Sequence, residues 1–327
     1  MDDRLQAVAA SQRGYFTRSQ ALDCGISDVE LRAAVREGVL RRLRHGTYVF
    51  AELYDALTPQ EQHVVLARSV IATMPGDVAL SHRSGSAAHG HDQWGWDMSV
   101  VDVTRLDGGA GRREAHVLHH VGTVDESDVV ERDGLLILRE DRVVVESCLV
   151  LDGESGLCTV DSALRQGRVT SAALERRLSD IARWQGARQA RLTILRGDGR
   201  AGSVGESRTR HIFWRNALPE PDLQYKVRDR SGHLLGITDF AWLEWRHVAE
   251  FDGMRKYRRD LRPGEDLGDV VVREKVREDL IRGEDLGMSR IIWAQLAPAT
   301  RRSMARDVWA AMEQSRRMYS WNRVVIV

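Results

Sequence analysis

The sequence is short of the residues that hold together small secreted proteins and membrane proteins. Its 327 residues include three cysteines, Cys24, Cys148 and Cys158, which lie far apart and form no CxxC pair. This usage is typical of a reducing compartment and excludes a disulfide framework. No apolar run reaches the roughly 20 residues of a membrane-spanning helix, and the first residues lack the basic-then-apolar layout of a signal peptide. We therefore expect a cytoplasmic protein with no membrane partner.

Excess charge of one sign is also lacking, because 48 basic residues balance 48 acidic residues. This balance excludes a protein that coats nucleic acid over its whole surface, although it leaves room for a local basic patch. Hydrophobic residues make up 43% of the chain, which is ample for several cores. At roughly 100–200 residues per domain, the length predicts two or three domains.

Residues 1–50 have a pattern of their own, which predicts three short helices and then a β-hairpin. Thr17 and Ser27 stand where N-caps of the second and third helices belong. Residues 40–49 predict two strands that turn at His45-Gly46. This is the layout of a winged helix-turn-helix, whose last helix and wing face DNA. The arginines of that helix and wing are the candidate DNA contacts: Arg32, Arg36, Arg41, Arg42 and Arg44.

Residues 51–196 predict an α/β connector without a recognisable catalytic pattern. The expected helices cover residues 58–71, 81–90, 143–151, 159–166 and 171–184, and the expected strands cover residues 98–103, 115–120 and 135–138. Six of the histidines here, His82, His89, His91, His116, His119 and His120, invite a zinc interpretation, but their spacing matches no compact zinc pattern. A Gly/Ser-rich stretch over residues 197–205 predicts a structureless joint and a domain boundary.

Residues 197–327 predict a third domain, in which a helix, three antiparallel strands, a helix and a strand follow one another. The chain as a whole is therefore expected to be of the α/β class. The expected elements are helix 204–217, strands 223–228, 234–242 and 246–252, helix 271–286, strand 290–295, helix 300–316 and a terminal β-like run at 323–327.

Acidic residues stand in these elements where an apolar strand or inward helix face should have none. Residues i and i+2 of a strand share a face, so Glu250 and Asp252 lie side by side, while Asp239 lies on the preceding strand. Glu206 shares the inward face of the first helix. Buried carboxylates are costly unless a cation compensates them, and a divalent metal ion prefers such oxygen ligands. The pattern predicts a site for Mg²⁺ or Mn²⁺.

This order of elements and acids resembles the PD-(D/E)xK nuclease superfamily, and within it the proteins related to very-short-patch-repair (Vsr) endonucleases. The likeness covers about residues 199–296 and rests on Gly205-Glu206-Ser207-Arg208, the strand of Asp239, Glu250-Phe251-Asp252-Gly253 and residues 273–279. It implies that Asp239 and Glu250 hold a metal that activates water and neutralises charge on the phosphate, with Glu206 completing the shell.

The chain departs from the superfamily pattern at Asp252, which replaces the lysine that usually follows the glutamate by two residues. Lys256 and Lys275 are the candidates to replace that lysine, and we favour Lys256. Other interpretations remain open: Asp252 as a turn residue, Glu206 as a partner of the helix dipole only, or the whole fold as an inactive scaffold. The basic residues after the last of these strands are either DNA contacts or a solvated loop: Arg255, Arg258, Arg259 and Arg262.

The N-terminal segment resembles the winged-helix domain of AbiEi-type antitoxins of type IV toxin–antitoxin systems. The matching text is Gly14-Tyr15-Phe16-Thr17-Arg18-Ser19-Gln20-Ala21, Gly38-Val39-Leu40 and Arg44-His45-Gly46-Thr47-Tyr48, continued by residues 80–84 and 87–90. In that family the domain binds DNA and represses its own operon. The alternative is a winged helix that mediates protein contacts.

Two principal hypotheses of function follow. The first is a Mg²⁺-dependent endonuclease of bacterial defence or repair, which the winged helix guides to double-stranded DNA. The second is a non-catalytic antitoxin-like repressor with a degenerate nuclease fold and a toxin or defence protein as its partner. A nuclease that acts on RNA is a third hypothesis.

Overall fold

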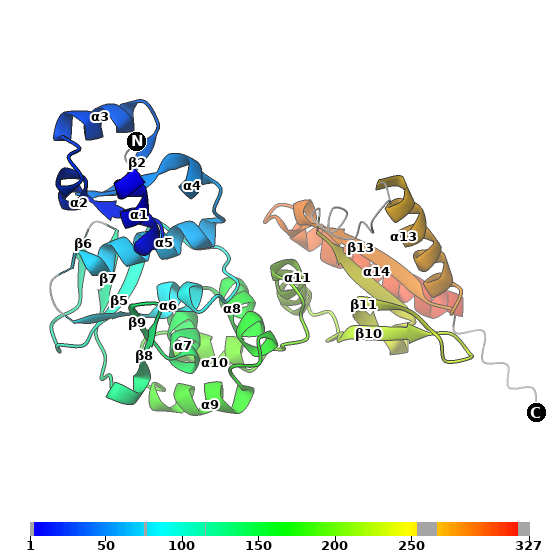
Figure 1. Ribbon diagram of the computed structural model, residues 1–327. Coiled ribbons are helices and arrows are strands. Elements are labelled where there is room, and N and C mark those ends of the chain that lie inside the picture. The colour runs from blue at the N-terminus through cyan, green and yellow to red at the C-terminus, as the bar shows by residue number, and fades with distance from the viewer. Residues whose placement is uncertain (1–2, 75–76, 115, 254–266, 320–327) are drawn as a thin grey trace, which may run out of the picture. The chain divides into compact units, whose positions relative to one another are not determined.

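The computed structural model describes residues 3–74, 77–114, 116–253 and 267–319, with side chains from residue 272 onward in the last range. Contacts divide the chain into two compact units (Figure 1). The first consists of Met1–Leu151 with Ala172–Arg191, and the second of Asp152–Ser171 with Leu192–Val327. Both units combine helices with β-sheets, which confirms the α/β class.

The winged-helix layout expected at the N-terminus is present in the first unit (Figure 1). Thr17 and Ser27 each form a capping box with the residue three positions later, so both expected N-caps are confirmed. Gly46 turns the wing with a φ of 75°, a value that glycine adopts without strain. The elements are α1 (Asp3–Ser11), β1 (Phe16–Thr17), α2 (Arg18–Asp23), α3 (Asp28–Arg36), β2 (Leu40–Arg44) and β3 (Thr47–Phe50), with sheet order β1-β3-β2.

The rest of the first unit is built on a six-stranded mixed sheet of order β6-β7-β5-β4-β9-β8. Ala79 and Leu80 are neighbours on β4 and bury opposite faces of the sheet, one toward α7 and the other toward α5. The strands are β4 (Val78–Leu80), β5 (Val101–Arg105), β6 (Arg112–Glu114), β7 (Val117–His120), β8 (Val129–Arg132) and β9 (Leu135–Leu138). The helices are α4 (Ala51–Asp55), α5 (Pro59–Ala72), α6 (His82–Ala88), α7 (Glu140–Val150), α9 (Ser171–Asp180) and α10 (Ala187–Ile194), with the short η1 (Glu126–Asp128).

Three of these strands, β4, β6 and β8, were not expected from the sequence. Each has only three or four residues, which is too short for a period of two to stand out. The strand expected at residues 98–103 begins three residues later, and the strand at Leu135–Leu138 lies where it was expected.

The second unit contains a four-stranded mixed sheet with helices on both faces, as the sequence predicted. Its strands β10, β11 and β12 are antiparallel, and β13 runs parallel to β12. One face packs against α11 and α14 through Phe213, Phe240 and Met312, and the other packs against α13 through Ala241 and Ile281. The elements are α8 (Gly153–Arg165), α11 (Val204–Arg215), β10 (Asp222–Arg228), β11 (Leu234–Trp242), η2 (Leu243–Trp245), β12 (His247–Asp252), α13 (Leu267–Arg282), β13 (Gly287–Ile292), η3 (Trp293–Leu296) and α14 (Arg301–Tyr319).

Helix α8 packs against α11 in the second unit, although the sequence placed it in the connector. A buried ion pair joins the two helices, with Arg210 Nη2 at 2.8 Å and 3.0 Å from the carboxylate oxygens of Asp161. The stretch expected to be a structureless joint also packs on α8, because a Cβ added at Gly199 would lie 2.8 Å from the backbone carbon of Leu164. The domain boundaries at residues 50/51 and 196/197 stay predictions, and the terminal run at 323–327 lies outside the described residues.

Candidate functional site

Glu206 and Asp239 meet in the second unit, although they come from α11 and β11. Glu206 is 4% exposed and Asp239 is 7% exposed. The side-chain nitrogen Nε2 of Gln224, on β10, lies 3.0 Å from Glu206 Oε2 and 3.3 Å from Asp239 Oδ1. One amide group therefore donates to both carboxylates, and three elements contribute to one polar site inside an apolar sheet. Sequence analysis identified the two acids and missed the amide.

Asp239 lies where strands β11 and β12 stop pairing. The backbone register runs from Trp242↔His247 to Phe240↔Ala249 and ends one residue short of Asp239. There the carboxylate oxygen Oδ2 accepts a hydrogen bond of 2.7 Å from the backbone N–H of Phe251. The carboxylate thus takes over the role of a strand carbonyl, and this contact fixes its orientation.

Gln224 reaches the site at an irregular point of β10, where no residue is inserted into the strand pairing. Its φ of 52° is in the left-handed region, which residues other than glycine seldom adopt. Leu223 packs in the core under α11 and α14, whereas Tyr225 packs in the core under α13. In a regular strand these two residues would share a face, so the left-handed backbone of Gln224 turns the chain over and redirects the side chain between them.

Glu206 also serves the start of α11, as one of the alternative interpretations held. Its Oε2 accepts a hydrogen bond of 2.7 Å from the backbone N–H of Gly202, and its Oε1 accepts one of 2.8 Å from Ser203 Oγ. Gly205 brings this turn close to β12, because a Cβ there would lie 2.0 Å from Cε1 of Phe251. The helix-terminal contacts and the contact with Gln224 are made by the same carboxylate, so one role does not exclude the other.

Glu250 is held by a cation from α13 that the sequence did not identify. Nη1 and Nη2 of Arg277 each lie 2.8 Å from one of its carboxylate oxygens. Burial opposes the charge of Arg277, but its hydrogen bonds to Glu250 and Glu274 raise its pKa above the usual value. Lys275 is exposed on the same helix, because residues two apart on a helix do not share a face. Asp252, at the end of the strand, lies 3.7 Å from Nη1 of Arg290 on β13.

Several predicted residues lie outside the described part of the chain. These are the favoured replacement for the missing lysine, Lys256, and the basic residues Arg255, Arg258, Arg259 and Arg262. Within residues 3–74, 77–114, 116–253 and 267–319, no three His, Cys, Asp or Glu side chains are grouped so as to hold a metal ion.

The acids at Gln224 nevertheless have the chemistry that a hard divalent cation requires. Two carboxylates converge on one donor nitrogen. Mg²⁺ usually takes one or two carboxylates and completes its shell with water and phosphate oxygens. Glu206 and Asp239 fit this requirement, whereas Glu250 is engaged by Arg277.

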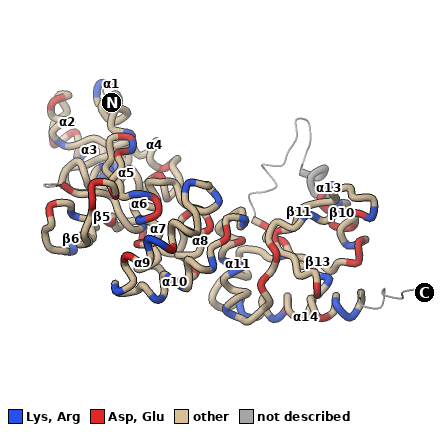
Figure 2. The backbone as a smooth tube through the Cα atoms, turned by 90° about the horizontal axis from the view of Figure 1, so that it is seen from below, with Lys and Arg blue, Asp and Glu red and all other residues tan. Residues whose placement is uncertain are grey.

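The predicted DNA-contacting arginines lie on α3 and on β2, the first strand of the wing. Arg32, Arg36 and Arg42 are exposed. Arg41 is also exposed but forms an ion pair of 2.7 Å with Asp55, and Arg44 is half-buried. Figure 2 shows basic and acidic residues interspersed along the chain.

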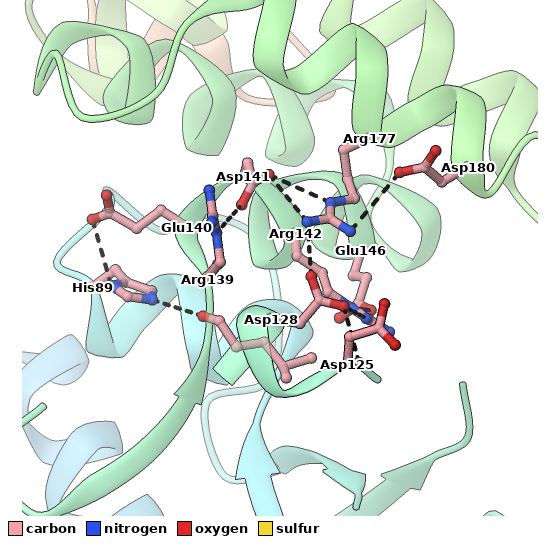
Figure 3. Close-up of polar contacts among 11 residues, drawn as sticks. His89, Asp125, Asp128, Arg139, Glu140, Asp141, Arg142, Glu146, Arg177 and Asp180 are labelled. Atoms are coloured by element: carbon pink, nitrogen blue, oxygen red, sulfur yellow. Dashed lines mark hydrogen bonds and ion pairs between the residues drawn. The ribbon is translucent and has the colours of Figure 1, made fainter. Parts of the chain in front are cut away.

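A second polar cluster lies in the first unit, beside a cavity of about 260 Å³. Arg142 lies between two acids, 2.5 Å from Asp128 and 2.8 Å from Glu146 (Figure 3). Arg177, from α9, adds a contact of 2.8 Å to Asp128. Burial raises the pKa of Glu146, and Arg142 opposes this rise. These charges compensate one another, so we assign the cluster a structural role between α7, α9 and η1.

The connector histidines also have structural partners. The rings of His82 and His120 stack with their centroids 3.5 Å apart, and His120 Nε2 lies 2.9 Å from Asp102. Burial, with His120 adding to its effect, lowers the pKa of His82 well below its ordinary value. Arg83 binds the same Asp102 with two hydrogen bonds. These four residues therefore form a cluster of ion pairs and ring contacts.

Comparison with known proteins supports the N-terminal part of the resemblance. Residues 3–51 match the family described as transcriptional regulator, AbiEi antitoxin. Two uncharacterized proteins of Mycobacterium tuberculosis, MT2308 and Rv2248, are each 27% identical to the chain over 254 residues, which covers 76% of this chain and 86% of theirs. The crystal structure of the RV2827C protein of the same species aligns with a TM-score of 0.37 and 17% identity, over 63% of this chain and 78% of that chain.

The family match spans the winged helix and stops where α4 begins. It thus covers the part of the chain that the sequence analysis assigned to DNA binding. The Vsr-like character of the second unit stays a prediction. In the described part of the chain, no helix has the length and apolar character needed to cross a membrane.

Proposed function

We propose that this chain is a DNA-binding transcriptional regulator, with α3 as the helix that enters the major groove and the β2–β3 hairpin as the wing. The supporting observation is that the AbiEi antitoxin match, residues 3–51, coincides with a folded winged helix that exposes Arg32, Arg36 and Arg42. Exposed arginines on such a helix and wing bind phosphates and base edges of double-stranded DNA. A toxin or defence protein as partner belongs to the same proposal.

The test is the salt dependence of DNA binding. The slope of log K against log salt is negative, and each phosphate contact that is lost reduces its magnitude by roughly 0.9. We expect Arg36→Gln and Arg42→Gln each to reduce the magnitude by about that amount on a random-sequence duplex, measured by fluorescence anisotropy. Arg13→Gln is the matched control, because Arg13 is exposed, lies outside the predicted interface and pairs with Asp133. Slopes unchanged in both interface variants would refute the assignment of α3 and the wing.

A second candidate function, a metal-dependent DNA endonuclease, is favoured by the convergence of Glu206 and Asp239. Both acids are buried, come from different elements and share one donor, the amide of Gln224. These two residues would hold Mg²⁺ or Mn²⁺, with Glu250 and Asp252 adjoining them. The ion would activate water and neutralise charge on the scissile phosphate. Lys256 and Lys275 remain the candidates for the basic group, and Arg277 is the cation found beside Glu250.

Cleavage of supercoiled plasmid with Mg²⁺ or Mn²⁺ tests this candidate. Nicking by the wild type should be abolished by Asp239→Asn and Glu250→Gln. Glu244→Gln is the control, because Glu244 is an exposed acid of the same sheet region. No cleavage, or cleavage that survives both site substitutions, would reject the nuclease and leave the regulator. A parallel RNA substrate separates the RNA-directed hypothesis, because only that hypothesis expects cleavage without deoxyribose.

A further inference from the structure

We propose that Gln224 is a metal ligand of this site, and that its amide N–H group compensates the two carboxylates when no ion is bound. This inference rests on the second candidate function. It identifies a residue that the acid pattern alone does not include. It also supplies a third oxygen donor at a site where, among the described side chains, only two acids converge.

The first argument is the backbone of Gln224. A φ of 52° in the middle of β10 is unfavourable for a residue with a side chain, and such conformations concentrate at functional sites. Gln224 is also missing from the paired residues of β10 and β11, whose register passes from Leu223↔Phe240 to Tyr225↔Thr238. The strand therefore departs from regular geometry at the one residue whose side chain enters the acidic site.

The second argument is the position of the amide nitrogen. Nε2 donates to Glu206 Oε2 and to Asp239 Oδ1, so its partial positive charge lies between two carboxylates. The other oxygen of Asp239, Oδ2, accepts from the backbone N–H of Phe251. Glu206 is fixed by the backbone N–H of Gly202, which donates to the same Oε2, and by Ser203 Oγ, which donates to Oε1. Two carboxylates held in this way form a preorganised pair, and the amide occupies the place between them.

The third argument is that an amide can exchange its donor for an acceptor in place. Nitrogen and oxygen are attached to the same carbon, and rotation about the terminal torsion of glutamine is broad and roughly two-fold. A cation between the carboxylates would repel the N–H groups and attract the carbonyl oxygen, so binding favours the flipped amide. Glu206, Asp239 and the flipped Gln224 would then offer three oxygens, and Mg²⁺ or Mn²⁺ would complete its shell with water and phosphate.

The fourth argument concerns Glu250, the acid that would otherwise supply the third oxygen. Both of its carboxylate oxygens are held by Arg277, and Arg277 also contacts Glu274. If Glu250 bound the metal ion, its bidentate ion pair with Arg277 would have to break, and such pairs are among the stronger hydrogen-bonded contacts. Gln224 needs only a torsional rotation, so it is the more accessible oxygen donor.

The test is Mn²⁺ binding by the full chain, measured by isothermal titration calorimetry and by the Mn²⁺ electron paramagnetic resonance signal. Gln224→Met keeps the length of the side chain and removes its oxygen, and we expect at least a tenfold weaker affinity. Gln224→Glu keeps an oxygen at that position, so its affinity should equal or exceed that of the wild type. Gln6→Met, at an exposed position of α1, is the control and should match the wild type.

Asp239→Ala separates failure of this inference from failure of the metal site. If the wild type binds no Mn²⁺, or if Asp239→Ala binds it equally well, the metal site itself is wrong and the inference is overturned with it. If Asp239→Ala abolishes binding while Gln224→Met stays within twofold of the wild type, the site stands and the role of Gln224 is refuted. An affinity of Gln224→Glu as weak as that of Gln224→Met also refutes it, because the amide would then act only as a donor.

Discussion

Gly205 sets the distance between α11 and β12, and its replacement by alanine is a direct test of how the acidic site is assembled. A Cβ at this position would lie 2.0 Å, 2.3 Å and 2.5 Å from three ring carbons of Phe251. Carbon atoms in contact normally lie about 3.5–4.0 Å apart. The ring is 3% exposed and packs edge-on against Trp293, with centroids 5.1 Å apart. The shortest of these distances is about 1.5 Å less than a normal contact. Because the ring has little space into which to move, α11 must shift by more than about 1 Å to relieve the clash.

Two opposing effects determine how much Gly205→Ala lowers the free energy of unfolding. Overpacking a well-packed core costs about 1–3 kcal/mol, and the short distances at Gly205 place this case at the upper end. Alanine is favoured over glycine inside a helix by about 1 kcal/mol, which offsets part of the loss. We expect Gly205→Ala to lower the free energy of unfolding of the second unit by about 2 kcal/mol in urea titrations. The shift of α11 also draws Glu206 away from Gln224, so Mn²⁺ affinity should fall.

The matched variant is Phe251→Leu, which removes the ring that meets the new methyl group. Alone it should destabilise the protein, because it leaves a cavity beside α11. Combined with Gly205→Ala it should be less destabilising than the sum of the two single changes, by at least about 1 kcal/mol, because neighbouring substitutions couple. An additive double variant, or a Gly205→Ala protein as stable as the wild type, would show that contact with Phe251 does not set the spacing.

Three further outcomes are expected. Arg210→Met should lower the free energy of unfolding in urea by about 3–5 kcal/mol, because it leaves Asp161 buried without its cationic partner. Adding Asp161→Leu should recover much of the loss. A double variant no more stable than Arg210→Met would contradict this. Burial lowers the pKa of His247 to about 4, below its unfolded value of 6.5, so the neutral ring is the folded form. Stability should therefore be intact above pH 6.5 and fall by up to about 3 kcal/mol as the pH drops toward 4, with a shallower decline in His247→Gln. Ser27→Ala removes the capping box with Glu30 and should cost about 1 kcal/mol in thermal unfolding of the first unit, against no change for Ser11→Ala.

Local chemistry accounts for what the sequence could predict. Thr17 and Ser27 mark helix starts through contacts within four residues, so their positions can be read without knowledge of the fold. Asp239 and Glu250 stand out because a strand's period of two places them among apolar residues. The order of helix and strands in the second unit follows from the same periodic signals.

The residues that the sequence could not reveal depend on contacts made over long distances. Gln224 enters the site where the backbone of β10 takes a left-handed conformation, and one such residue leaves no trace in a pattern of period two. The choice of Arg277 over Lys275 depends on how α13 is turned about its axis, which its packing on the sheet decides. Helix α8 is tied to α11 by Arg210 and Asp161, 49 residues apart, and no local rule connects them.

The chain passes between its two compact units three times, after residues 151, 171 and 191. Neither unit is therefore a continuous stretch that a single cut could release. A fragment that begins at residue 197 would carry Arg210 without Asp161 and expose the side of α11 that α8 covers. During synthesis the first unit cannot close until α9 and α10 have left the ribosome, by which time α8 has already been made and must wait for α11. Proteolytic cleavage between residues 151 and 191 should therefore destabilise both units at once. Two domains that each consist of one continuous segment would not show this coupling.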